Sequence, residues 1–331
     1  MSKNAMKTHV FAVMDEPYCV WEHPLDQHNV DFLAGIDTEY FRFAADKLNA
    51  SEQSSDDQRR TATLLRSVYH HAMETFFSLI GATLQAPHCV YGWLTQCKTE
   101  ALRTLVEQIS EEKFASPHVM KDDTVSWTSI ATWIFGNGDT DEDERIRAIE
   151  CFADLWAKCA EIFLRQQSID EYNSLKHGFR VELGGFQLEM QVKGPEASES
   201  PTKYLPLGGS KYGSSYFRLE RIGGNERANR SLLPQHHRIN WSVEQTRSLL
   251  VLLGVSIHNV IGFLKVLNGT PGNSVRLHCP TNDQFHEPWN HSVGLLSMNV
   301  DRTVPNWAVR STSKQELNEH LTKWHKWRTT Q

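Results

Sequence analysis

The stretch TATLLRSVYHHAMETFFSLIGATL, residues 61–84, decides the fold of this chain. At 100° per residue its apolar side chains fall on one broad face of an α-helix, as expected for a helix in a protein core. That face contains Leu65, Val68, Tyr69, Ala72, Phe76, Leu79 and Ile80. The polar residues Arg66, His70 and Glu74 follow the edge of the face at intervals of four. We predict a helix from about residue 58 to 85 whose polar edge meets a second element.

Helical patterns continue on both sides of this stretch. They cover residues 26–50, 89–111, 127–135 and 139–177. The last begins with the acidic run DTDEDE, which favours the positive end of a helix, and is followed by Gly178, a residue favoured just after a helix. Because four or five such helices joined by short loops pack well side by side, we predict that residues 1–178 form an antiparallel helical bundle.

The pattern changes at Phe179, where FRVELGGFQLEMQV alternates apolar and polar residues around Gly184 and Gly185. Such alternation around two glycines predicts a β-hairpin. A loop rich in Gly, Ser and Pro then leads to a third predicted strand at residues 216–222. We therefore predict that residues 179–235 form a small antiparallel β insert, so the fold is mainly α and α+β overall.

Helix returns in residues 236–331, which we expect to belong to one continuous globular unit with the first segment. Ser242 and Gln245 have the spacing of a capping box, and the apolar run behind them reaches Asn268 and Gly269. A loop rich in Pro, Asn and His follows. The last helix is expected to begin at Ser313, with Glu316 in the same capping relation.

Composition predicts a folded cytoplasmic protein. Forty per cent hydrophobic residues are typical of a globular chain, and the net charge of −6 excludes a binder of nucleic acid over its whole surface but allows a local basic cleft. The six cysteines show no C-x-x-C pair, as in reduced cytoplasmic proteins. The apolar run at residues 10–14 is too short for a signal peptide. His258, Asn259 and Lys265 interrupt the most apolar segment, so we expect a buried helix there and no membrane partner.

The polar edge of the central helix carries the groups that cleave RNA without a metal. An Arg can grip a phosphate, and a His a few residues away can move a proton. A solvated helix face, with Glu74 paired to a His or Arg at helical spacing, is the alternative. A third interpretation is a metal-binding helical bundle with His70 or His71 and Glu74 as ligands, although the di-iron pattern Glu-x-x-His does not occur in the chain.

Two fragments resemble the HEPN superfamily, small helical bundles found in prokaryotic toxins and phage-defence ribonucleases. The family motif is Arg, an often polar residue, three more residues and then His, and Arg66 with His71 satisfies it. The fragment YNSLKHG, residues 172–178, resembles the end of the late helix that usually carries this motif. There the Arg is missing, and Asn173 lies four residues before His177. The resemblance covers residues 58–178.

The resemblance implies metal-independent RNA cleavage or RNA binding in a bacterial stress or antiphage defence system, with no cofactor. His71 or His177 would be the general base, and Arg66 would stabilise the phosphoryl oxygens with Lys176 as a second cation. The candidate catalytic residues are Arg66, His70, His71, Glu74, Asn173, Lys176 and His177. Family members usually pair their motifs across a dimer, so a homodimer is expected. An imidazole in a last helical turn, such as that of His177, also has a structural role as a cap.

Three other segments offer alternatives. A non-catalytic interaction protein would dock a partner through the end of its last helix, Trp324 to Arg328, since Trp and Arg dominate interface hot spots. The coil residues His278, Cys279, His286 and His291 are of types that bind zinc, but their spacing matches no zinc motif. Residues 176–230 carry nine Lys or Arg and six Glu with tyrosines between them, a composition that can follow a nucleic-acid backbone.

Overall fold

The computed structural model describes residues 8–21, 25–48, 54–115, 124–136, 141–192, 203–222, 231–291, 297–301 and 312–329. Its central element is α3 (Ser55–Gln85), which begins after Ser54, whose side chain accepts a hydrogen bond from the Asp57 N–H. Two acidic residues in its first turn favour the helix dipole. The predicted long helix is therefore confirmed, and it begins three residues earlier than expected.

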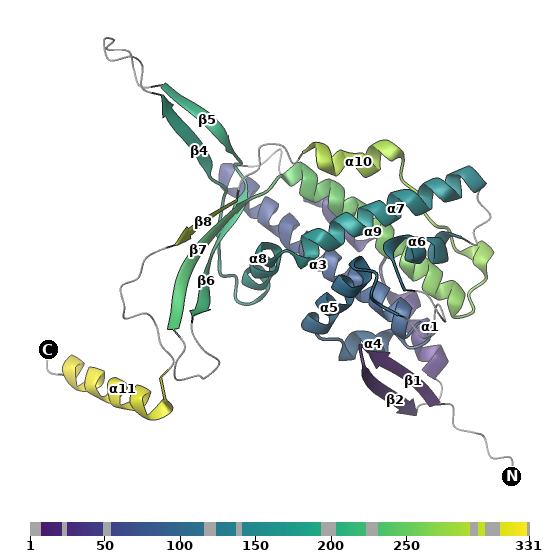
Figure 1. Ribbon diagram of the computed structural model, residues 1–331, viewed down its shortest axis with the longest axis horizontal. Helices are drawn as coiled ribbons and strands as arrows, with labels where there is room; N and C mark the ends of the chain where they lie inside the picture. Colours follow the sequence, from purple (N-terminus) through teal and green to yellow (C-terminus); the bar gives the residue numbers. More distant parts are fainter. Residues whose placement is uncertain are drawn as a thin grey trace.

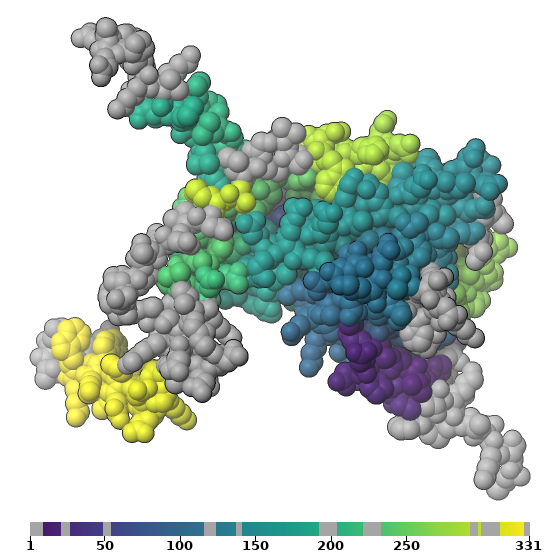
Figure 2. Space-filling model, in the orientation of Figure 1, coloured from purple at the N-terminus to yellow at the C-terminus, as the bar shows by residue number. Residues whose placement is uncertain are grey.

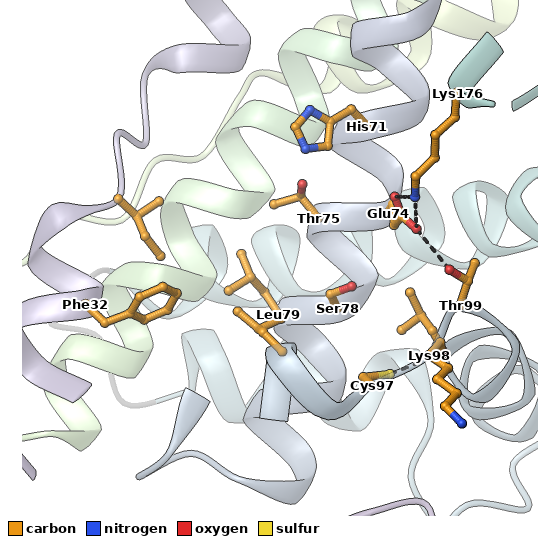
Figure 3. Close-up of a pocket in the computed structure, with 13 residues that line it drawn as sticks. Phe32, His71, Glu74, Thr75, Ser78, Leu79, Cys97, Lys98, Thr99 and Lys176 are labelled. Atoms are coloured by element: carbon orange, nitrogen blue, oxygen red, sulfur yellow. Dashed lines mark hydrogen bonds and ion pairs between the residues drawn. The ribbon is translucent and has the colours of Figure 1, made fainter. Parts of the chain in front are cut away.

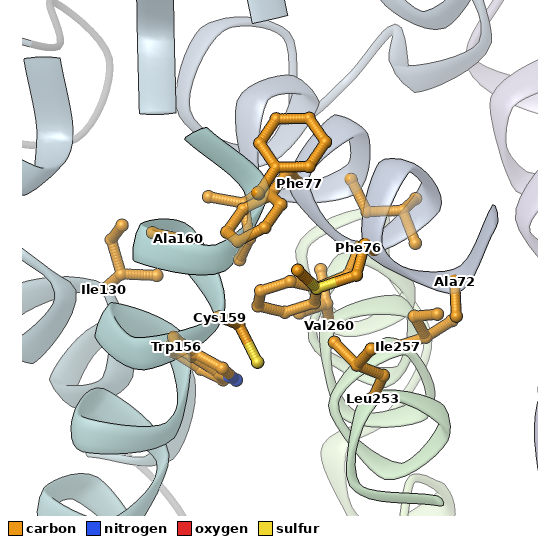
Figure 4. Close-up of a cluster of buried hydrophobic side chains, with 14 of the residues drawn as sticks. Ala72, Phe76, Phe77, Ile130, Trp156, Cys159, Ala160, Leu253, Ile257 and Val260 are labelled. Carbon is orange, nitrogen blue, oxygen red and sulfur yellow. The ribbon is translucent and has the colours of Figure 1, made fainter. Parts of the chain in front are cut away.

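The core lies where α3 packs on α9 (Val243–Leu267) and α7 (Glu142–Leu164) (Figure 1). Phe76 of α3 lies 5.4 Å from Trp156 of α7 between ring centroids, and Phe77 lies 4.8 Å from Phe163. Figure 4 shows these rings with Ile257 and neighbouring aliphatic side chains of α9. All the residues of this cluster are buried, so the predicted apolar face of the central helix is a core face.

Shorter helices surround these three. They are α1 (Leu25–Gly35), α2 (Tyr40–Lys47), α4 (Val90–Gln96), α5 (Thr99–Ser110), α6 (Trp127–Phe135), α8 (Gln166–Lys176) and α10 (Asn282–Asn290), with a 3₁₀ turn at Gly272–Ser274. The chain is thus mainly α with some β structure, as predicted, and α6 was expected at the same residues.

Three of the expected helices are each divided in two, which the sequence pattern did not show. Between α1 and α2 the Asp37 side chain accepts the Glu39 N–H, which starts a new helix. Cys97 and Arg165 have extended backbones, with ψ of 122° and 128°, and so separate α4 from α5 and α7 from α8. Apolar periodicity continues across these single residues, so the breaks were not visible in it.

The β structure differs most from the prediction. A four-stranded antiparallel sheet has the order β3 (Val181–Leu183), β6 (Gly213–Ile222), β7 (Ser231–Asn240), β8 (Ser297–Asp301). A separate ribbon pairs β4 (Gln187–Val192) with β5 (Lys203–Gly209), and an N-terminal hairpin pairs β1 (Thr8–Val13) with β2 (Glu16–Trp21). The third predicted strand lies within β6, whereas β1, β2, β5, β7 and β8 were not predicted.

The predicted hairpin around Gly184 and Gly185 is wrong, because β3 and β4 belong to different sheets. The Gly185 N–H donates to the Lys211 carbonyl, and the Phe186 N–H donates to Asn240 Oδ1. A Cβ on Gly185 would lie 2.7 Å from the Tyr212 carbonyl oxygen. The two glycines therefore allow a close crossing beneath the β6–β7 sheet and do not form a turn.

The C-terminal third follows the prediction in its caps. Ser242 accepts the Gln245 N–H at the start of α9, and Ser313 and Glu316 bond reciprocally before α11 (Lys314–Thr329). α10 lies where a loop was expected, and its cap is Thr281. By length and composition α9 could cross a membrane, but 72% of its most apolar stretch is buried in the protein. In Figure 2 the β4–β5 ribbon and α11 stand away from the helical body.

Candidate functional site

The polar edge of α3 meets α8, as the need for a second element predicted. Arg66 and His70 contact Glu171 of α8, and Glu74 contacts Tyr172 and Lys176 one turn further along. The two helices are thus joined by two adjacent polar groups. The solvated helix face is wrong for His70, which is only 5% exposed.

The first group is a buried ion pair around Glu171, which is fully buried. Arg66 Nη2 lies 2.7 Å from one carboxylate oxygen, and His70 Nε2 lies 3.1 Å from the same atom. Ser214 of β6 donates to the other oxygen at 2.6 Å and accepts the Trp241 indole N–H at 3.1 Å. This network fastens α3, α8 and the sheet to one another.

Electrostatics fix the protonation states of this group. Burial favours a neutral Glu171, but the charge of Arg66 and the hydrogen bonds from His70 and Arg66 outweigh it and hold the pKa of the carboxyl well below its usual range. Burial lowers the pKa of His70 more than the bond to Glu171 raises it. His70 is therefore a neutral donor to a charged carboxylate at neutral pH, with Arg66 as the balancing cation.

The second group is centred on Glu74 (Figure 3). Its carboxylate accepts the Tyr172 hydroxyl at 2.6 Å, the Lys176 ammonium at 3.1 and 3.2 Å, and the Thr99 hydroxyl of α5 at 3.4 Å. Burial would raise the pKa of Glu74, but the Tyr172 and Lys176 hydrogen bonds lower it overall. The Tyr172 ring also stacks on His70 at 5.3 Å, which links the two groups.

A cavity of about 490 Å³ opens beside Glu74 between α3, α8 and the α4–α5 segment. Its lining residues are Phe32, Ile36, His71, Glu74, Thr75, Ser78, Leu79, Leu94, Cys97, Lys98, Thr99, Leu102 and Lys176. The exposed His71 ring rests edge-on against Phe41, with 5.6 Å between centroids. Two lysines and this histidine therefore share a cavity whose lining has Glu74 as its carboxylate, and hydroxyl groups lie between them.

The structure brings together three of the seven predicted residues in this cavity, His71, Glu74 and Lys176. It separates Arg66 from His71, because Arg66 turns to Glu171 while His71 turns to Phe41. The predicted pairing of these two residues on one phosphate is therefore not formed within the chain. Arg66 and His70 are committed to the buried ion pair.

The remaining two residues, Asn173 and His177, lie outside the cavity lining. His177 is the exposed residue that ends α8, and its N–H donates to the Asn173 carbonyl. That carbonyl also accepts the Arg180 guanidinium at 3.4 Å. This arrangement agrees with the helix-end role that was the alternative for His177.

Glu171, Lys98 and Thr99 were missed as members of the site. One signal could have found Glu171, because it shares a helix face with Ser174 and Leu175 and so places a carboxylate among buried positions. Such a carboxylate needs a cationic partner. Lys98 and Thr99 begin α5, and only the separation of α4 from α5 turns them toward α3.

Two of the other predicted segments have a different role in the structure. The Tyr216 hydroxyl donates to the Gln167 carbonyl, and the ring of Tyr212 stacks on Trp241, so these two tyrosines serve packing rather than base stacking. Within the residues that the structure describes, no three His, Cys, Asp or Glu side chains lie close enough to hold a metal ion. That statement covers His278, Cys279, His286 and His291.

Comparison with known proteins adds no assignment. No family model matches the sequence, and neither the curated proteins nor the solved structures include a significant match.

Proposed function

We propose that this chain binds RNA through the cavity between α3, α5 and α8, and cleaves it without a metal with His71 as general base. The observation that carries the proposal is the meeting of His71, Lys98 and Lys176 in one cavity of about 490 Å³. A phosphate needs cationic donors, and a ribose hydroxyl needs a base within reach. The cavity supplies both kinds of group.

The chemistry follows from these side chains. The His71 imidazole takes the proton of a ribose 2′-hydroxyl, and the 2′ oxygen attacks the adjacent phosphorus. The bond from phosphorus to the 5′ oxygen breaks, and this oxygen takes a proton from water. The products are a 2′,3′-cyclic phosphate and a 5′-hydroxyl end. Lys176 stabilises the charge on the phosphoryl oxygens, a role that the sequence had given first to Arg66.

RNA is preferred among phosphate ligands because α3 and α8 are the two helices that resemble HEPN proteins. The antiparallel bundle, the role in bacterial stress or antiphage defence and the homodimer belong to the same proposal. A cytoplasmic location agrees with six cysteines that are all free.

Binding of a labelled single-stranded RNA in EDTA tests the first half of the proposal. Lys98→Ala and Lys176→Ala should each weaken binding several-fold and lower the salt dependence by about 0.7 per lost phosphate contact. Lys158→Ala is the matched control, because this lysine is paired with Asp154 on α7, outside the cavity. Unchanged affinity in the Lys98→Ala/Lys176→Ala double variant would contradict RNA binding at this cavity.

A second candidate is the non-catalytic interaction protein, and the surface of α11 favours it. Leu317, Leu321, Trp324 and Trp327 follow one face of this helix and are each about half exposed. Its described residues carry four Lys or Arg against two Glu, whereas the whole chain has a net charge of −6. This opposite charge makes a second copy of the chain the proposed partner.

The mass in solution tests this candidate. Leu321→Glu should convert a dimer to a monomer in light scattering, because a buried carboxylate at the contact is unfavourable. Leu64→Glu, a similarly exposed position on α3, should leave the mass unchanged. A monomeric wild-type protein would exclude the second copy as partner.

A further inference from the structure

Glu74 holds the cation that a phosphate in the cavity needs. The Lys176 ammonium lies 3.1 and 3.2 Å from its two carboxylate oxygens. The Thr99 hydroxyl, a second donor of the cavity lining, also donates to Glu74. A carboxylate of the protein therefore already occupies donors that would otherwise face a bound anion.

The position of Glu74 makes this occupancy matter for a ligand. Its side chain is 18% exposed and lines the cavity, so its charge faces the space that an anion would enter (Figure 3). Like charges a few ångströms apart repel more strongly in a partly buried site than in water. Tyr172 holds the carboxylate from the opposite side with a bond of 2.6 Å, so Glu74 stays in place when Lys176 moves.

Lys176 can make that move. Its side chain is 41% exposed, and apart from Glu74 it contacts the Tyr172 ring, 5.2 Å from the ammonium. A flexible lysine at the cavity edge can therefore exchange a carboxylate for a phosphate without disturbing the core. The buried Arg66 cannot do so, because its partner Glu171 is fully enclosed.

We propose that Glu74 is a built-in competitor of the ligand phosphate, and that phosphate binds when Lys176 leaves Glu74 for it. This inference rests on the proposed RNA site and names the residue that sets its affinity. The cavity then discriminates against weak anions, because a ligand must replace an ion pair that already exists. Removing the charge of Glu74 should open the site to phosphate.

Isothermal titration with inorganic phosphate, in EDTA, tests the competition. Glu74→Gln keeps an acceptor for the Tyr172 hydroxyl but loses the charge, and should bind phosphate roughly tenfold more tightly than the wild type. Asp154→Asn is the control, since it removes the same unit of charge and also releases a lysine, Lys158, outside the cavity. It should change phosphate affinity less than twofold.

A double variant shows whether the released lysine is responsible. Glu74→Gln/Lys176→Ala should lose the gain, because the cation that meets the phosphate is then absent. Glu74→Met, similar in size and also uncharged, should show the same gain as Glu74→Gln if the glutamine variant folds poorly, with thermal unfolding as the check on both. Equal or weaker binding by both single variants would overturn the competition, and would indicate that Glu74 positions Lys176 for the ligand.

Titration of the same proteins with the RNA separates this inference from the proposed function. A phosphate gain in Glu74→Gln without RNA binding by any variant would retain the competitor and reject the RNA site. RNA binding by the wild type without a gain in Glu74→Gln would reject the competitor alone. A gain that persists in the double variant would also reject it.

Discussion

At the scale of single residues, Glu171 is the carboxylate on which the joint between α3, α8 and β6 depends. It accepts bonds from Arg66, His70 and Ser214, so all its near neighbours are donors. A buried ion pair adds little net stability compared with apolar packing, but breaking it leaves an unpaired charge. Such a residue holds the site together without taking part in its chemistry.

Glu171→Gln should therefore lower the free energy of unfolding by about 3–5 kcal/mol, because the buried Arg66 loses its counter-charge. Urea denaturation followed by circular dichroism measures the change. Glu161→Gln is the control, since its pair with Arg165 is exposed and 3.9 Å long, and should change stability by less than about 0.5 kcal/mol. A loss below about 1 kcal/mol for Glu171→Gln would contradict the structural role.

His70 gives the protein a pH-dependent stability. Its pKa in the folded state is below the ordinary 6.5, so the unfolded chain binds a proton more readily. The stability from a neutral His70 is complete above pH 6.5 and is lost as the pH falls toward the lowered pKa. Glu171 loses its contribution in the same direction, but below its own ordinary value of 4.5.

We expect the free energy of unfolding to fall between pH 7.5 and 5.5, and this slope to be smaller in His70→Gln. Urea denaturation at several pH values measures it. Part of the slope should remain, because burial also lowers the pKa of His278. The exposed His177 is the control, and His177→Gln should keep the wild-type slope. Equal slopes in the wild type and His70→Gln would contradict the assigned state of His70.

At the scale of elements, α3 approaches α4 and α5 closely at Gly81. A Cβ at this position would lie 2.7 Å from Trp93 Cζ2 and 2.8 Å from Leu105 Cδ2. Both side chains are buried, so neither can move aside freely. This close approach also sets the distance between α3 and the start of α5, where Lys98 and Thr99 line the cavity.

Gly81→Ala should destabilise the protein by about 1–3 kcal/mol through overpacking, despite the better helix propensity of alanine. Thermal unfolding measures the shift. Gly35→Ala is the matched control in α1, where a Cβ meets no atom within 4 Å, and it should be neutral or slightly stabilising. A gain in stability for Gly81→Ala would show that α4 and α5 pack less tightly on α3 than described.

Elements with local signals could be predicted from the sequence, and those formed by long-range pairing could not. α3, α9 and α11 have both apolar periodicity and capping side chains, so their positions followed from neighbouring residues. β7 and β8 pair with strands far away in the chain, and their residues show no clear alternation. The turn prediction at Gly184 failed because the same glycines also serve a close crossing.

The candidate site shows the same division. His71, Glu74 and Lys176 could be named because two helices carried polar residues at helical spacing. The partner of Arg66 could not, since Glu171 lies 105 positions away and is reached only through the packing of α8 on α3. A helical wheel gives the direction of a side chain, but not which element it meets.

At the scale of the whole molecule, the helical body and the projecting parts have separate roles in the proposals. The cavity lies within the body, whereas the β4–β5 ribbon and α11 stand away from it (Figure 2). RNA cleavage at the cavity therefore does not require α11, and the Leu321→Glu variant should keep any cleavage that one copy can perform. The two proposed functions can thus be tested independently.

Cleavage of mixed RNA in EDTA by the wild type, His71→Gln and His177→Gln tests the central proposal most directly. We predict that the wild type and His177→Gln produce 2′,3′-cyclic phosphate ends, and that His71→Gln is at least about a hundredfold slower, because it lacks the general base. Circular dichroism should show all three proteins folded. Intact RNA with the wild type, or equal cleavage by folded His71→Gln, would contradict the assignment of His71 as the base of a metal-independent ribonuclease.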